Sequence, residues 1–476
     1  MKNKKLIKNT ALYSLGEILP RALSFILLPI YTRYLSPGDY GITSYTHTII
    51  LFLYVLGAFG LNTFVLRYYF IYEEEEKQKT LIGTAFLSIA LINIVIIVGA
   101  FIIMPEIIEK YSIQVPWNPY FKLAFIINFF DCLSIIPSVV YRVRQDAMKF
   151  VALSFSRTLL TVLLTVYCLS IKNLGVLGVF QAQLYIVIPY AFIYLFIINK
   201  YARWKIDFDC LKEGLKFAFP LVPGSICYIL LSMSDRVVLE RNVGISELGI
   251  YNVACQMALV LNIVIQSGYK AIEPELFRRF GNDSFYDFIG KIKSIFFCAI
   301  YIGALLLCLF SQEVFFLMTS EAFHEGYLLV PALMVGVVMT GQNVIYGGVL
   351  QGERRTKVNG GATIMGALIS IIMNLILIPL FGTYAAAVSS AVSFFVMNTI
   401  LFVSMTYPGK SMWRELVLVL IIPFVSYLVF SLFREISMVN LLVKILLTSL
   451  YALVAIRLLG IDVNDVKVII KNKQIV

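Results

Sequence analysis

The chain has 476 residues, of which 60% are hydrophobic and only 14% are charged, and its formal net charge is +11. A soluble globular domain has about 25% charged and 45–50% apolar residues, so this composition excludes an ordinary soluble protein. A basic chain can indicate nucleic-acid binding, but here most Lys and Arg residues lie between long apolar segments, which disfavours that function.

The apolar residues form long segments with charged connectors between them. A hydrocarbon core about 30 Å thick requires about 20 apolar residues per helix. The sequence therefore predicts an all-α integral membrane protein with about 14 transmembrane helices. Their expected ranges are 9–35, 40–70, 80–104, 119–141, 150–171, 175–199, 216–240, 246–274, 289–311, 327–350, 358–380, 383–406, 413–433 and 438–459.

Basic residues are distributed unequally between alternate connectors. One set carries clusters such as Arg142 to Lys149 and Lys200 to Lys216, and the other set carries only Lys110, Lys122, Lys172, Arg241 and Arg434. Cytoplasmic connectors are enriched in Lys and Arg, so both termini are predicted to be cytoplasmic. The basic start lacks an obvious cleavage site, which predicts a retained first helix instead of a cleaved signal.

An internal repeat appears at an offset of 208 residues. The matching pairs fall at corresponding positions of two six-helix blocks, and six helices bring both blocks into the same orientation. We expect an N-terminal lobe over 1–206, a C-terminal lobe over 207–406, and two additional helices with a cytoplasmic tail over 407–476. The pairs are Lys8 and Lys216, Gly16 and Gly224, Arg33 and Arg241, Gly41 and Gly249, and Lys149 and Lys357.

The first predicted helix has a polar stripe that includes Glu17, Arg21 and Ser24. Charged groups within a membrane are costly and face the bundle interior or a hydrated cavity. One interpretation is that Arg21 binds an anion in a central cavity and Glu17 modulates it. The alternative is that Glu17 and Arg21, four residues apart, only neutralise each other.

A second stripe occupies the eighth predicted helix, with Asn252, Gln256, Gln266 and Lys270 on one face. Lys270 either binds substrate or extends to the inner membrane interface. We predict that these residues and the stripe of the first helix line one substrate cavity.

Two acids are candidates for ion coupling. Asp131 is the deepest acid of its helix, and Asp235 could take up a proton or cation. Asp235 could instead pair with the neighbouring Arg236. Arg157 is expected to reach water at the membrane interface.

Motifs for catalysis and for cofactors are not apparent. The chain has seven dispersed cysteines and two histidines, and it has no glycine-rich phosphate loop or zinc-protease motif. The sequence predicts no cofactor, no metal site and no enzyme activity. Arginine matches phosphate oxygens in a bidentate manner, so the predicted cationic cavity favours an anionic substrate.

Several motifs resemble one family. The segment LLPIYTRYLSPGDYG over residues 27–41 resembles the opening of the Wzx-type polysaccharide flippases, which belong to the multidrug/oligosaccharidyl-lipid/polysaccharide exporter superfamily. Ser234-Asp235-Arg236, Gly249-Ile250-Tyr251 and residues 351–354 resemble its second repeat. This resemblance implies a V-shaped, two-lobed transporter. It also implies movement of undecaprenyl-diphosphate-linked repeat units of O-antigen, capsule or exopolysaccharide from the cytoplasmic to the outer leaflet by alternating access.

The same resemblance implies a location in the bacterial cytoplasmic membrane. It names undecaprenyl-diphosphate-linked oligosaccharide and membrane lipid as binding partners, with the polysaccharide polymerase and chain-length machinery as further candidates. The competing function is a cation-coupled multidrug antiporter of the same superfamily, which would require Asp131 or Asp235. A scaffold for polysaccharide assembly would instead tolerate every polar substitution within the membrane.

Overall fold

The protein is represented by a computed structural model that describes residues 12–13, 16, 18–20, 22–23, 25–111, 114–280, 285–406, 412–433 and 435–461. These residues form helices and connectors without any β-strand, which confirms the all-α fold class. Twelve of the described helical segments are long and apolar enough to cross a membrane. The chain divides into two compact units, residues 1–249 and 250–476. The predicted lobe boundaries at residues 206 and 406, and the predicted V shape, stay predictions.

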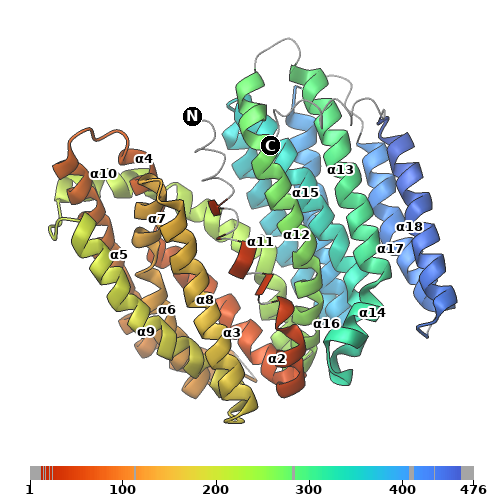
Figure 1. The fold of residues 1–476 in the computed structure, drawn as a ribbon, viewed down its shortest axis with the longest axis horizontal. Coiled ribbons are helices and arrows are strands. Elements are labelled where there is room, and N and C mark those ends of the chain that lie inside the picture. The colour runs from red at the N-terminus through yellow and green to blue at the C-terminus, as the bar shows by residue number, and fades with distance from the viewer. Residues whose placement is uncertain are drawn as a thin grey trace. The chain divides into compact units, whose positions relative to one another are not determined.

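The first unit is a helical bundle (Figure 1). Its core consists of aliphatic and aromatic side chains. Phe64, Leu81, Phe86, Ile136 and Val140 are among its fully or nearly fully buried residues. Its described helices are α2 (Leu28–Tyr34), α3 (Pro37–Ala58), α4 (Leu61–Tyr68), α5 (Glu75–Tyr111), η1 (Trp117–Phe121), α6 (Lys122–Cys132), α7 (Ile135–Val143), α8 (Ala147–Ser170), α9 (Gly175–Tyr201), α10 (Phe208–Ala218), α11 (Leu221–Asn242) and the start of α12 (Ile245–Arg279).

The second unit contains the rest of α12 and the helices that follow it. Tyr301, Tyr346, Phe297 and Phe315 are fully buried within it. Its further described helices are α13 (Phe285–Leu309), α14 (Ser311–Met318), η2 (Glu321–Leu329), α15 (Val330–Gly352), α16 (Thr356–Ser404), α17 (Trp413–Leu432) and α18 (Met438–Leu458).

Helix α3 begins at a strong local signal. The Ser36 hydroxyl accepts from the backbone N–H of Asp39 at 3.2 Å, and the Asp39 carboxylate accepts from the backbone N–H of Ser36 at 3.1 Å. This capping box, followed by Pro37, starts the helix at Pro37. The expected single helix over 40–70 is wrong, because Phe59 and Gly60 both have positive φ and separate α3 from α4.

The starts of α3 and α12 cross each other with no side chain between their backbones. A Cβ atom on Gly41 would lie 1.9 Å from the carbonyl oxygen of Ile245, and one on Gly249 would lie 1.9 Å from that of Pro37. Pro37 and Ile245 are 208 residues apart, as are Gly41 and Gly249. Such a reciprocal contact, in which equivalent positions exchange roles, is typical of elements related by a two-fold axis. This geometry supports the internal repeat.

Helix α16 is 49 residues long but is interrupted at Gly382, where φ is 63° and ψ is −141°. Only glycine adopts that conformation readily. The expected boundary between helices 358–380 and 383–406 falls at this residue. Eight of the 27 residues of the first expected helix, 9–35, lie outside the described residues, and the count of 14 stays a prediction.

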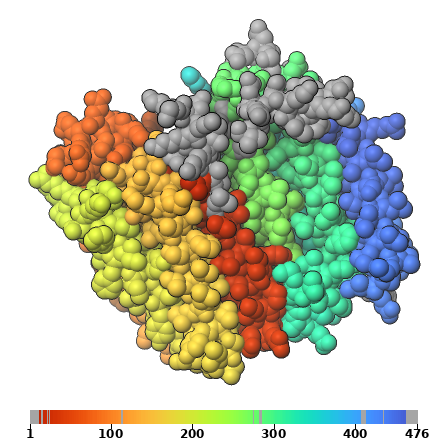
Figure 2. Space-filling model, viewed as in Figure 1, coloured from red at the N-terminus to blue at the C-terminus, as the bar shows by residue number. Residues whose placement is uncertain are grey.

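Helices α17 and α18 pack on α13 at one edge of the second unit (Figure 2). Lys293 of α13 pairs with Glu415 of α17 at 2.7 Å, and Lys444 of α18 pairs with Glu313 of α14 at 2.6 Å. The opposite face of α18 exposes a stripe of large apolar side chains, as expected for a helix that faces lipid. This stripe contains Met438, Leu442, Ile445, Leu446, Leu450 and Leu453.

Candidate functional site: a polar cavity in the first unit

The first unit contains an open cavity of about 650 Å³. One face of α8 supplies a wall at helical spacing, and one face of α6 and α7 supplies another. The α8 wall extends over 16 residues, from Phe150 to Thr165, or about 22 Å at 1.5 Å per residue. The polar or charged residues that line the cavity are Tyr31, His47, Tyr54, Asn62, Asp131, Ser134, Ser138, Arg142, Ser154, Arg157, Thr158, Thr161, Thr165, Gln183 and Tyr194.

Asp131 and Arg157 form an ion pair across this cavity, from α6 to α8. Their side chains are 30% and 27% exposed, so both retain access to the cavity. The Tyr194 hydroxyl of α9 also lies beside the Arg157 guanidinium. Arg157 is ten residues into α8, about 15 Å from its start. It pairs with Asp131, and the expectation that it reaches water at the membrane interface stays a prediction.

Hydroxyl groups fix the backbone around the ion pair. Ser134 donates to the carbonyl of Asp131 at 2.6 Å, and Thr161 donates to the carbonyl of Arg157 at 2.9 Å. Ser154 donates to the carbonyl of Gly16 at 3.0 Å, which joins α8 to the N-terminal segment. The cavity wall is therefore held by side-chain bonds to the backbone as well as by packing.

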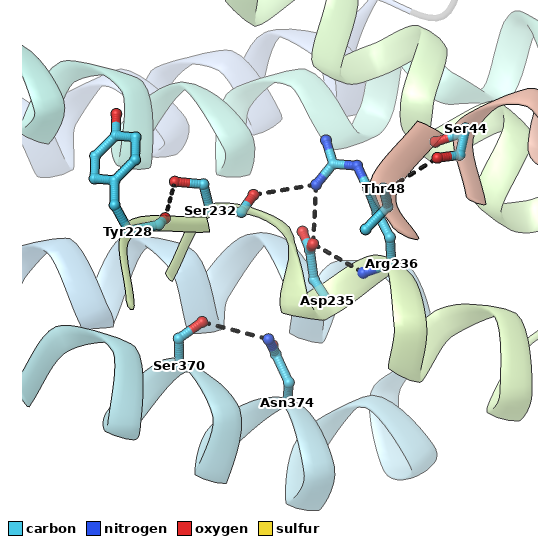
Figure 3. Close-up of polar contacts among 8 residues, drawn as sticks. All are labelled: Ser44, Thr48, Tyr228, Ser232, Asp235, Arg236, Ser370 and Asn374. Carbon is cyan, nitrogen blue, oxygen red and sulfur yellow. Dashed lines mark hydrogen bonds and ion pairs between the residues drawn. The ribbon is translucent and has the colours of Figure 1, made fainter. Parts of the chain in front are cut away.

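The pair Asp235 and Arg236 lies on α11 in the same unit (Figure 3). Their side chains are 2.9 Å apart, and the Arg236 guanidinium also donates to the carbonyl of Ser232 at 3.2 Å. Both residues are buried, with exposures of 2% and 9%. Of the two alternatives for Asp235, the structure contains the pairing, and a role in ion coupling stays a prediction.

The polar stripe of α12 belongs to the second unit. Asn252, Gln256, Gln266 and Lys270 are each partly exposed, whereas the opposite face, with Ala254 for example, is buried. The stripe is therefore less buried than the opposite face of the same helix. Their assignment to substrate binding stays a prediction.

Three residues of the predicted site lie outside the described residues: Glu17, Arg21 and Ser24. Their proximity to the cavity is therefore untested, although Pro20 of the same segment lines it. Within the described residues, no group of three or more His, Cys, Asp or Glu side chains is placed to hold a metal ion.

Tyr31 lies seven residues after Ser24, so its spacing already placed it on the polar stripe of the first predicted helix. Sequence reasoning did not identify the cavity residues Tyr54 and Tyr194, because the sequence alone does not distinguish them from tyrosines at the membrane interface. The sequence did indicate part of the cavity. Ser154, Arg157 and Thr161 are spaced so that all three lie on one face of a helix, and this face of α8 lines the cavity.

Several solved transporter structures are similar to this fold. A lipid II flippase MurJ in an inward closed conformation has a TM-score of 0.73 at 15% identity, covering 94% of this chain and 98% of its own. A multidrug resistance MATE family transporter of the MOP superfamily, inward-facing, has a TM-score of 0.66 at 14% identity, covering 86% and 95%. At these identities the likeness shows the fold.

Curated relatives include a succinoglycan biosynthesis transport protein ExoT of Rhizobium meliloti, 24% identical over 54% of this chain and 50% of its own length. The Lsg locus putative protein 1 of Haemophilus influenzae is 23% identical over 57% of this chain and 65% of its own length. Both matches therefore span less than two thirds of the relative. The capsular polysaccharide biosynthesis protein CapF of Staphylococcus aureus is 20% identical over 82% of this chain and 97% of its own length.

A family model described as polysaccharide biosynthesis protein matches residues 6–278. This range covers more than half of the chain and includes the whole cavity wall of α6, α7 and α8. The protein is a multi-pass membrane protein with a transporter fold, and it belongs to the polysaccharide biosynthesis protein family.

Proposed function

We propose that the protein is a flippase for lipid-linked oligosaccharides. Its substrate is an undecaprenyl-diphosphate-linked repeat unit of a polysaccharide, which it moves from the cytoplasmic to the outer leaflet of the bacterial cytoplasmic membrane by alternating access. Both termini are cytoplasmic in this proposal. The polysaccharide polymerase and chain-length proteins are the partners that would receive the exported unit.

The observation that carries this proposal is the polar cavity of about 650 Å³ inside the first unit. Hydroxyl, amide and tyrosine side chains are suited to the hydroxyl groups and ring faces of a saccharide, and arginine is suited to its phosphates. Polar side chains inside a membrane bundle cost free energy unless they bind a ligand or water. Its presence in a polysaccharide biosynthesis protein supports a saccharide substrate.

Residues of each unit are proposed to bind the substrate. In the first unit, Arg21 binds the diphosphate, with Glu17 and Ser24 as further groups. In the second unit, Lys270 supplies a cation, and Asn252, Gln256 and Gln266 form hydrogen bonds to the substrate. Asp131 and Asp235 are the proposed ion-coupling acids. In a cavity of low dielectric constant, each charged contact is stronger than it would be in water.

Identification of the intermediate that accumulates without the protein is the direct test. Cells that lack it should accumulate undecaprenyl-diphosphate-linked oligosaccharide, and mass spectrometry of extracted lipids would identify it. Normal levels of all lipid-linked saccharides in these cells would refute the proposed substrate class.

Complementation of those cells tests the cavity. Arg21→Ala and Arg157→Ala should each abolish export while the protein still inserts in the membrane. Arg203→Ala is the matched control, since Arg203 forms an ion pair with Glu76 at 3.0 Å but both side chains are more than 60% exposed. Wild-type export by both Arg21→Ala and Arg157→Ala would contradict the proposed role of the cavity.

A cation-coupled multidrug antiporter is the second candidate function. It is favoured by the carboxylate of Asp131 in the cavity and by the similarity to multidrug transporters. This function predicts that expression protects cells from toxic organic cations and that Asp131→Asn removes the protection. Unchanged sensitivity to such cations, together with accumulated lipid-linked saccharide in the deletion strain, would exclude it.

A further inference from the structure

Helix α10 of the first unit has two unlike faces. On one face, Gly214 and Ala218 are buried, and a Cβ atom on Gly214 would lie 2.8 Å from the ring of Phe64 on α4. The ring of Phe217 also packs edge-on against Tyr68 of α4, with 5.7 Å between the ring centres. These contacts fix which side of α10 faces the bundle, where it lies beside α4 (Figure 1).

The opposite face of α10 carries exposed apolar side chains. Phe208, Leu215 and Phe219 follow one another at spacings of seven and four residues, which places them on one side of the helix. Phe208 is 78% exposed and Phe219 is 64% exposed, and Leu215 between them is half-buried. Contiguous exposed apolar side chains mark a surface that contacts something outside the chain.

The place of α10 in the chain favours lipid as that contact. It connects α9 to α11, and both of these helices are long and apolar enough to span a membrane, so α10 lies at a membrane surface. Trp204 of the same connector is 48% exposed, and its indole N–H donates to the side chain of Asn199 at 2.9 Å. A tryptophan held in this way is typical of the head-group region of a bilayer.

Two lysines accompany the exposed apolar side chains. Lys212 lies four residues after Phe208 and Lys216 four residues further on, so both are on the exposed side of α10. Among the described residues, neither lysine has an ion-pair partner. A lysine beside apolar groups can bury its aliphatic chain in the interface and present its ammonium group to a lipid head group.

Most carboxylates of α10 and its N-cap are engaged elsewhere. Asp207 caps the start of the helix, where its carboxylate accepts from the backbone N–H groups of Asp209 and Cys210, each at 3.0 Å. Glu213 accepts a hydrogen bond from the Tyr72 hydroxyl at 3.0 Å. Asp209 is exposed, so the exposed side of α10 presents two lysines and one carboxylate that bind no other described side chain. This excess of positive charge favours an anionic head group.

We propose that the exposed side of α10 is a binding surface for anionic phospholipid. It consists of Phe208, Lys212, Leu215, Lys216 and Phe219. The aromatic rings enter the boundary between head groups and acyl chains, and the ammonium groups contact the lipid phosphates. The predicted topology places this surface at the cytoplasmic leaflet. It lies outside the polar cavity, so the inference does not depend on the proposed transport substrate.

Fluorescence quenching on the full-length protein in lipid nanodiscs tests insertion of this surface. A fluorophore is attached to Phe219→Cys in a variant whose three half-buried cysteines are replaced by serine. Phospholipids with brominated acyl chains quench a fluorophore that touches lipid, whereas iodide quenches one in water. Phe219→Cys should be quenched by the brominated lipid. Asp209→Cys, on the same helix, is the matched control and should be quenched by iodide.

The same labelled protein measures which lipid is preferred. Brominated phosphatidylglycerol should quench the fluorophore on Phe219→Cys more than brominated phosphatidylcholine at equal content. Replacement of both lysines, Lys212→Gln with Lys216→Gln, should reduce this preference by at least about fivefold, because each lysine near an anionic surface contributes about that factor.

Lys357→Gln is the matched control for the lysines. Lys357 is exposed, belongs to another connector on the predicted cytoplasmic side, and has no ion-pair partner among the described residues. It has no aromatic residue within four positions in the sequence. Its substitution should change the preference measured at position 219 by less than about twofold, because the lysine is not part of the inserted face.

Three results would overturn the assignment. Quenching by iodide alone at Phe219→Cys would place the surface in water, where a protein partner would be its occupant. Equal quenching by the two brominated lipids, before any lysine is replaced, would remove the preference for anionic lipid. An equal loss of preference in Lys357→Gln would show a general effect of charge instead of a site on α10. If Phe219→Cys fails to fold, Phe208→Cys provides the same three measurements.

Discussion

Asp131 and Arg157 form an ion pair, and each charge is stabilised by the opposite charge of its partner. Removal of one partner leaves a charge in a partly desolvated cavity, whereas neutral replacement of both leaves none. We therefore expect Asp131→Asn and Arg157→Gln each to lower the thermal unfolding midpoint, and the double variant to be more stable than the sum of the single effects predicts. The coupling free energy should be about 0.5–3 kcal/mol.

Thermal unfolding of the detergent-solubilised protein, followed by intrinsic fluorescence, measures this coupling. Arg203→Gln with Glu76→Gln gives the control cycle, because that ion pair is exposed and should show little coupling. Strictly additive effects at Asp131 and Arg157 would show that the pair adds nothing to stability.

Cys210 provides a residue-scale prediction outside the membrane spans. It lies on α10, where burial, with Asp207 and Glu213 as further causes, raises the pKa of its thiol to about 11. Only the thiolate reacts with maleimide, so a raised pKa lowers the reactive fraction at neutral pH. The labelling rate of a variant whose single cysteine is Cys210 should rise about tenfold per pH unit and continue to rise above pH 9.

Glu213→Gln is the companion variant for this measurement. It removes a nearby negative charge, lowers the pKa of Cys210 and should increase the labelling rate at pH 8. A rate that levels off near pH 8.5, the ordinary value for a cysteine, would contradict the prediction.

The sequence identified candidate polar residues of the site, but it did not predict which of them form pairs. Asp131 was recognised as a deep acid, but its partner Arg157 lies on another helix, 26 residues away. Helical periodicity relates residues on one helix and contains no information on the rotation of its neighbour. The partnership between two helices is therefore visible only in three dimensions.

At the scale of elements, α18 depends on an ion pair within the bundle. Lys444 is fully buried, and its ammonium group lies 5.9 Å from the ring centres of Phe310 and Phe430 as well as 2.6 Å from the Glu313 carboxylate. Lys444→Ala should lower the free energy of unfolding by about 3–5 kcal/mol, because it leaves a carboxylate without its cation. The double variant Lys444→Met with Glu313→Gln should be much closer to the wild type.

Unfolding temperatures in detergent report this difference. Lys77→Met is the control, since Lys77 pairs with Glu74 at 2.9 Å and both side chains are more than 60% exposed. It should change the stability by less than about 1 kcal/mol. A double variant at Lys444 and Glu313 that is no more stable than Lys444→Ala would show that packing around the lysine, and not its charge, attaches α18.

Element boundaries were predictable where the cause is local. The end of the helix over 358–380 was predictable because Pro379 and Gly382 disrupt a helix by their own geometry. The break between α3 and α4 was not, because Phe59 has a φ of 45° although phenylalanine rarely adopts this conformation. Contacts with other parts of the fold must stabilise this backbone conformation of Phe59, and the local sequence does not predict those contacts.

For the whole molecule, the asymmetry of Lys and Arg residues predicts its orientation. We expect fusion of a fluorescent protein to the C-terminus to give a fluorescent cell, and fusion of alkaline phosphatase at the same point to be inactive. A phosphatase fusion in the connector after α8, at Lys172, should be active. The reverse pattern of reporter activities would show that the predicted membrane topology is inverted and would contradict the proposed direction of transport.

The overall class was predictable because the thickness of a membrane imposes one length on every spanning helix. The repeat was visible as a few matched residues, and its spacing of 208 residues recurs in the starts of α3 at Pro37 and α12 at Ile245. How helices rotate to enclose a cavity was beyond the sequence, because that depends on the packing of many side chains at once.

The bare crossing at Gly41 and Gly249 limits how the two repeats can diverge. Gly41 faces the carbonyl oxygen of Ile245, and Gly249 faces the carbonyl oxygen of Pro37. A methyl group on either glycine would therefore push the two helices apart. The close approach therefore fixes the separation of the two helices at positions that are 208 residues apart in the chain.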